Sequence, residues 1–123
     1  MSAPNIVNVT SIIGKTAYMS PTTSVATVVS NAASSGKVFK VNTIMVANID
    51  GAVAADITIN YYTQDDVGGT AFAICKTVSV PADASLVVVD KSGGIYLEED
   101  RSIGAIAGAD GDLQIICSYE EIQ

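Results

Sequence analysis

Apolar side chains in this sequence recur at every second residue. Over residues 55–61 the odd positions are apolar and the even positions polar, and Leu113, Ile115, Cys117 and Tyr119 repeat the pattern. Successive side chains of a strand point to opposite sides, so this alternation marks a strand with one buried face. The sequence therefore predicts a chain built almost entirely of β-strands.

A strand is also expected over residues 38–48, and its side chains can be assigned to faces by strict alternation. Phe39, Val41, Met45 and Ala47 then share one face. The other face carries Val38, Ile44 and Val46, so part of this strand is expected to be buried on both sides. The remaining strands are predicted at residues 6–13, 25–30, 71–80, 86–90, 95–97 and 103–107. Residues 24–33 are Ala-rich and allow a helix, but their β-branched content favours a strand.

The breaks between these strands carry the residues that reverse a chain. They are Asp50-Gly51, Gly68-Gly69, Pro81-Ala82-Asp83, Ser92-Gly93-Gly94 and Asp110-Gly111-Asp112. The spacing leaves no room for the crossover helices of a parallel sheet. We therefore predict one all-β domain, an antiparallel β-sandwich or jelly roll of about eight strands with an extended N-terminal arm.

Residues 1–35 differ from residues 36–123 in character, because they are rich in Ser, Thr, Asn and Ala and carry a single charge, Lys15. They are nevertheless too apolar for a disordered tail. Two interpretations stay open: the first strands of the same sandwich, or an arm that adds strands to a neighbouring subunit. The sandwich domain itself is assigned to residues 36–123. The candidate subunit-interface residues of the arm are Ile6, Val9, Ile12 and Tyr18.

Composition excludes several function classes. The chain has 123 residues, no His, 6 basic and 13 acidic residues, and a net charge of −7. Without His the usual general base and commonest metal ligand are missing, and no basic cluster could follow a phosphate backbone. No apolar run is long enough for a membrane helix. We predict no enzyme activity, no catalytic residues, no cofactor, no metal site, and no direct contact with nucleic acid or membrane.

The remaining polar and sulfur-containing groups have ordinary structural explanations. Glu98-Glu99-Asp100, Asp65-Asp66 and Asp110-Gly111-Asp112 are expected to be solvated turns, although the last could offer some oxygen ligands to Ca²⁺. Cys75 and Cys117 are expected to be buried free thiols, with an inter-strand disulfide as the alternative. No secretory signal peptide is recognised near the N-terminus, which suits a reducing cytosol.

Several segments resemble a known group of proteins. They are residues 46–51, 55–58, 80–88, 95–99 and 116–121, together with residues 34–38. The sequence is similar here to small virion structural proteins of tailed bacteriophages, especially marine and cyanobacterial phages, and the resemblance covers most of the chain. Relatives tend to carry Gly-Asp after Leu-Glu-Glu, where this chain has Asp100-Arg101. The resemblance implies a noncatalytic building block of the virion, assembled in the cytoplasm of the host bacterium.

Within that class we expect a capsid decoration or cement protein that stabilises the head lattice. Because 49% of its residues are hydrophobic and only 15% charged, surface should be buried between subunits, with a homo-oligomer expected and a trimer favoured. The major capsid protein is the expected partner. The alternatives are a neck, tail or fibre protein of the same virion, or a carbohydrate- or receptor-binding module using Tyr61, Tyr62 or Tyr96 with Asp65 or Asp66.

Overall fold

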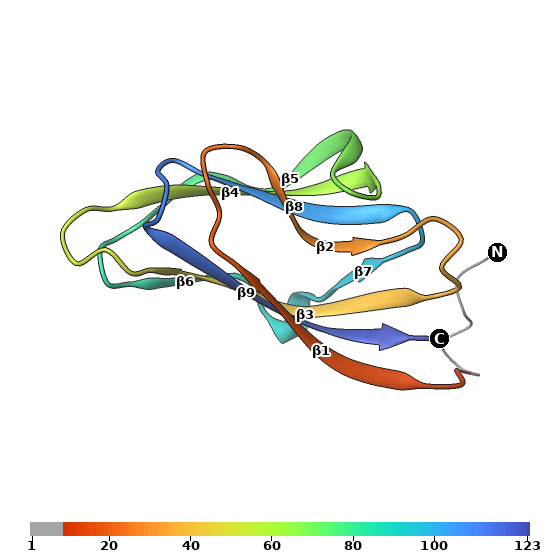
Figure 1. The fold of residues 1–123 in the computed structure, drawn as a ribbon. Coiled ribbons are helices and arrows are strands. Elements are labelled where there is room, and N and C mark those ends of the chain that lie inside the picture. The colour runs from red at the N-terminus through yellow and green to blue at the C-terminus, as the bar shows by residue number, and fades with distance from the viewer. Residues whose placement is uncertain (1–8) are drawn as a thin grey trace.

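The computed structural model describes residues 9–123, which form two facing antiparallel sheets (Figure 1). The strands are β1 (Ile12–Met19), β2 (Ala26–Asn31), β3 (Val38–Asn48), β4 (Ala55–Gln64), β5 (Gly68–Val80), β6 (Ser85–Val89), β7 (Ile95–Leu97), β8 (Arg101–Ala107) and β9 (Leu113–Ile122). One short 3₁₀ helix, η1 (Lys91–Gly93), precedes β7. The predicted all-β antiparallel sandwich is confirmed.

The pairing of the strands is nested along the chain. Sheet A has the order β1-β9-β3-β6, with β7 also paired to β3, and sheet B has the order β2-β8-β4-β5. The first strand thus lies beside the last, the second beside the eighth, the third beside the sixth, and the fourth beside the fifth. This nesting is the strand order of a jelly roll. The short β7 is the strand added to the eight of that scheme.

Among the described residues, the first strand begins later than the sequence predicts. A strand was expected over residues 6–13, but β1 begins at Ile12, and residues 1–8 lie outside the described part. Ser11 exchanges backbone hydrogen bonds with Gln123, the last residue of the chain. Thr10 also donates its backbone N–H to the carbonyl oxygen of Gln123. Residues 24–33, for which a helix was the alternative, contain the strand β2.

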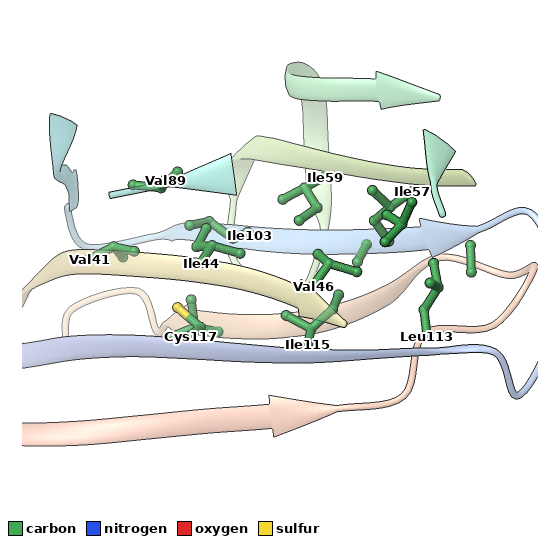
Figure 2. Close-up of a cluster of buried hydrophobic side chains, with 14 of the residues drawn as sticks. Val41, Ile44, Val46, Ile57, Ile59, Val89, Ile103, Leu113, Ile115 and Cys117 are labelled. Atoms are coloured by element: carbon green, nitrogen blue, oxygen red, sulfur yellow. The ribbon is translucent and has the colours of Figure 1, made fainter. Parts of the chain in front are cut away.

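The core lies between the two sheets (Figure 2). From sheet A, β3 and β9 contribute side chains that face those of β4 and β8 in sheet B. The fully buried members include Val41, Ile44, Val46, Ile57, Ile59, Ile103, Leu113, Ile115 and Cys117. The alternation predicted for residues 55–61 and 113–119 is confirmed, since the apolar positions of β4 and β9 face this core.

The face assignment predicted for β3 is wrong beyond its middle. The register of β3 against β9 shifts between Val41 and Thr43, so Asn42 is an extra residue, a β-bulge. A bulge reverses the alternation of the side chains that follow it. Ile44 and Val46 are therefore fully buried on the inner face, whereas Met45 is 41% exposed on the outer face.

Two buried amides link the sheets at opposite ends of the sandwich. Asn31 ends β2, and its Nδ2 donates to the carbonyl oxygens of Lys37 and Leu97 at 2.9 and 3.0 Å. Asn48 ends β3, and its Nδ2 donates to the carbonyl oxygens of Val53 and Val80 at 3.0 and 2.9 Å. Both side chains are fully paired, which removes the cost of burying them. Sequence alone gives no sign that these two asparagines differ from the others.

We predict that Asn48→Ala lowers the free energy of unfolding by about 2–4 kcal/mol, because it leaves two buried carbonyl groups without donors. Asn60→Ala is the matched control, since Asn60 is half-buried and, within residues 9–123, its side chain forms a single long hydrogen bond, from Nδ2 to the hydroxyl of Tyr62 at 3.4 Å. Chemical denaturation of both variants measures the difference. Equal losses in the two variants would contradict the proposed link.

Candidate functional site

A row of exposed apolar side chains crosses the outer face of sheet A. Tyr18 of β1 is paired with Ile116 of β9, Ile116 with Met45 of β3, and Met45 with Val87 of β6. Directly paired residues of antiparallel strands project to the same face. The four side chains are 81%, 50%, 41% and 55% exposed. We call Tyr18, Ile116, Met45 and Val87 the apolar row.

The rows on either side of it carry no charge. One contains Thr16, Ser118 and Thr43, and the other contains Gln114, Ala47 and Ser85. A shallow hollow of about 510 Å³ opens at the β1 end, lined by Tyr18, Met19, Ser20, Gln114, Ile115 and Ile116. In a chain of net charge −7, an uncharged apolar band that crosses four strands has the character of a protein interface.

Two of the residues predicted to lie at a subunit interface are on this face. Tyr18 begins the apolar row, and Ile12 lies on the same face of β1 and is 54% exposed. Val9 is half-buried just before β1, and Ile6 lies outside the described residues. Whether any of the four contacts another subunit stays a prediction.

Three members of the row were missed from the sequence. The exposure of Ile116 could have been predicted, because Ile116 is an apolar residue at an outward position of a strand whose apolar residues otherwise alternate inward. Val87 has apolar neighbours on both sides in the sequence, so no alternation shows which face of the sheet its side chain is on. Met45 was placed in the core, since the bulge at Asn42 leaves no mark in the sequence.

Residues of the predicted N-terminal arm pair within this chain where they are described. β1 is hydrogen-bonded to β9 at the edge of sheet A, and β2 to β8 at the edge of sheet B. The division of the chain at residue 35, and any contact of residues 1–8 with a neighbour, stay predictions.

A buried carboxylate fixes β1 to the rest of sheet A. Glu121 of β9 is 5% exposed and forms ion pairs with Lys15 of β1 at 2.9 Å and with Lys37, just before β3, at 2.8 Å. Hydrogen bonding to Lys37, then to Lys15, holds the pKa of Glu121 below its ordinary value. The same contact raises the pKa of Lys15. The only charge of β1 is thereby directed inward, away from the apolar row.

The acidic clusters hold turns together. Glu99 accepts a hydrogen bond from the backbone N–H of Gly36, and Asp100 accepts one from that of Asp65. Asp110 accepts one from the N–H of Thr23 at 2.9 Å. Within residues 9–123 no three His, Cys, Asp or Glu side chains are grouped as a metal site would require. These carboxylates stabilise loop backbone instead of converging on a ligand.

The tyrosines considered for carbohydrate stacking do not form one platform. Tyr61 and Tyr62 project to opposite faces of β4, and Tyr62 is only 8% exposed. The Tyr61 hydroxyl donates to the carbonyl oxygen of Tyr96 at 3.3 Å, which fixes it against β7. Tyr61 and Tyr62 therefore do not act as one stacking surface, and a carbohydrate site that uses Tyr61, Tyr62 or Tyr96 with Asp65 or Asp66 stays a prediction.

Both cysteines are free thiols, and they lie in different sheets. Cys117 of β9 is fully buried, and burial raises its pKa to about 12. Cys75 of β5 is half-buried, which corrects the expectation that both are buried, because β5 is an edge strand. Burial raises the pKa of Cys75 as well. Neither group is an activated nucleophile, which would need a lowered pKa.

Comparison with known proteins supports the fold. No family model matches the chain, and no curated protein matches it. One solved structure, described as "Bacillus endospore appendages form a novel family of disulfide-linked pili", aligns with 100% of this chain and 90% of its own. The TM-score is 0.53 and the sequence identity 13%, so the likeness concerns the fold. No helix in residues 9–123 is long and apolar enough to cross a membrane.

We predict that Cys117→Ser lowers the free energy of unfolding by about 1–3 kcal/mol, because the new hydroxyl is buried among apolar side chains. Cys75→Ser is the matched control and should cost clearly less, since its side chain reaches solvent. Denaturant unfolding in the presence of a reductant makes the comparison. A larger loss for Cys75→Ser would show that the two environments are assigned wrongly.

The ion pairs of Glu121 make the stability of the fold depend on pH. Because the pKa of Glu121 is lower in the folded chain than its ordinary value of 4.5, the stability it contributes is complete above that value. The contribution is lost as the pH falls through the lower, folded value. Glu121→Gln should therefore lower stability at neutral pH by about 1–2 kcal/mol and flatten the acid limb of the profile.

Thermal unfolding between neutral pH and pH 3 measures this profile. Glu98→Gln is the control, because Glu98 is exposed and outside the ion pairs. An unchanged acid limb in Glu121→Gln would contradict the assignment.

Proposed function

We propose that this protein is a noncatalytic structural component of a bacteriophage virion, and within the virion a decoration or cement protein that stabilises the capsid lattice. Its partners in this proposal are further copies of itself and the major capsid protein. The protein acts by contact: it lays a preformed, rigid sheet face on other subunits and buries apolar surface between them.

The observation that carries the proposal is the apolar row. Tyr18, Ile116, Met45 and Val87 cross the whole width of sheet A with no charged side chain in the rows beside them. Tyr and Met are residue types that interfaces favour, and charged groups are depleted in interface cores. A regular sheet also presents this surface at little entropic cost, because its side chains are already ordered by the strands.

The fold likeness is compatible with a role in a repeating assembly. The similar structure belongs to an endospore appendage described as a disulfide-linked pilus. In the present chain Cys117 is enclosed by the core, and both thiols have raised pKa values. These two cysteines do not favour covalent linkage, so we propose that assembly is held by apolar contacts.

The phage assignment comes from the sequence resemblance of the strand and turn segments. A neck, tail or fibre position in the same virion is the alternative, since the same surface could serve there. Quantifying copies per particle by mass spectrometry separates the two. Hundreds of copies support the capsid lattice, whereas a few to some tens place the protein at the neck or tail.

Attachment to the particle tests the role of the row. Ile116→Lys and Met45→Lys should each reduce binding to capsids that lack the protein by roughly tenfold or more, because they put an unpaired charge in the centre of an interface. Ser79→Lys is the matched control, since Ser79 is exposed on the outer face of sheet B.

Binding is measured by co-sedimentation with capsids, and thermal unfolding confirms that each variant is folded. Capsid binding that survives both substitutions in the row while Ser79→Lys abolishes it would contradict the proposed surface.

A further inference from the structure

The free edge of β1 lacks the features that usually prevent strand pairing between molecules. Within residues 9–123, β1 pairs with β9 alone, and its other edge has no strand partner. The register between β1 and β9 is unbroken over all eight pairs from Ile12 to Met19. β1 contains no proline, and its single charge, Lys15, is engaged by Glu121. A long, regular edge whose one charge already has a partner within the chain can act as a template for another strand.

The other edges of the two sheets are protected. β2 has six residues and a register shift between Thr27 and Val29. β6 has five residues and a shift in its pairing with β3, and β7 has only three residues. β5 is long, but its register shifts three times, and it carries the exposed Lys76 and a left-handed Thr77 with φ 51°. Bulges, short length and charge all discourage pairing.

Hydrogen bonding shows which groups of β1 are free. Ser11 and Gln123 donate to each other's carbonyl oxygens at 2.8 and 3.0 Å, so Ser11 is a hydrogen-bonded pair position. In an antiparallel ladder these positions alternate. The odd residues of β1 therefore face β9, and the N–H and C=O groups of Ile12, Gly14, Thr16 and Tyr18 point away from it. The same even residues project their side chains to the outer face of sheet A.

We propose that β1 pairs antiparallel with β1 of a second copy, about a two-fold axis at Lys15. In this register Ile12 and Gly14 of one copy lie opposite Tyr18 and Thr16 of the other. All four free backbone positions of each strand are then paired. The two sheets A become one continuous sheet, and the two apolar rows lie on its common face.

A second copy of β1 fits this edge better than the other strands that a second copy offers. It matches the edge in length and has no bulge, whereas β2, β5 and β6 each carry a register shift. Identical antiparallel strands are self-complementary, as a two-fold interface requires. The register also brings together Ile12 and Tyr18, which are 54% and 81% exposed in a single copy. The two Lys15 side chains lie opposite each other at the axis, and the ion pair of each with Glu121 on the inner face offsets the repulsion between them.

This inference rests on the geometry of the edge, and not on the proposed place of the protein in a virion. It also differs from the trimer expected from the sequence, because a closed trimer would need two different edges to meet. The test therefore uses the purified full chain without capsids.

Light scattering coupled to size exclusion should give twice the mass of one chain. Thr16→Pro should give the mass of one chain, because it removes an outward N–H that the pairing with β9 does not use. Thr16→Ala is the matched control and should remain dimeric.

The double variant Ile12→Lys, Tyr18→Lys should also be monomeric and folded, since both side chains are exposed. Deletion of residues 2–8 should leave the dimer intact.

Cross-linking tests the register. In a Cys75→Ala background, chains with Ile12→Cys mixed with chains carrying Tyr18→Cys should form a disulfide dimer on mild oxidation. Either variant alone should form much less, because each residue lies far from its own copy across the axis. The proposal would be overturned by a monomeric or trimeric wild-type chain, or by a dimer that survives both Thr16→Pro and the double lysine variant. Loss of the dimer on deletion of residues 2–8 would also overturn it. So would equal cross-linking in the single variants.

Discussion

The extra residue at Asn42 decides which side chains of the central strand β3 are buried. Before it, Phe39 and Val41 face the core, and after it Ile44 and Val46 do. Without the bulge, one half of the strand would direct its large apolar side chains to the outside. The bulge therefore completes the core and at the same time places Met45 on the outer face. The core and the apolar row are two consequences of one local irregularity in a central strand.

The buried carboxylate of Glu121 complements this arrangement at the neighbouring edge. It pairs with Lys15 of β1 and with Lys37 before β3, and so ties the first, third and last strands of the jelly roll together. Because Lys15 projects to the inner face and pairs there with Glu121, the side chains that β1 presents on the outer face of sheet A are uncharged. The acidic residues Glu99, Asp100 and Asp110 bind loop backbone, and the apolar row with its two neighbouring rows carries no charged residue.

Much of the fold could be predicted because alternation and turn residues are local signals. The pattern of β4 and β9 identified their inner faces, and most of the Gly, Pro and Asp clusters located reversals of the chain. Gly68-Gly69 was wrong as a break, because it begins β5 and the turn lies at residues 65–67. Within the described residues, the strand predicted at residues 6–13 overlaps β1 only at Ile12 and Ile13, because the apolar pattern of this segment does not mark where pairing with β9 begins. Of the surface, Tyr18 and Ile12 were recognised as exposed apolar residues.

By itself the sequence determined the class of fold, the absence of imidazole chemistry, and an acidic chain with more apolar residues than one core explains. Only the tertiary structure decided that Tyr18, Ile116, Met45 and Val87 form one row, because these residues are far apart in the chain and meet through strand register. It also decided which edge is left regular. Register depends on bulges and on where partner strands end, and these are set by the packing of the whole sandwich and not by any single segment.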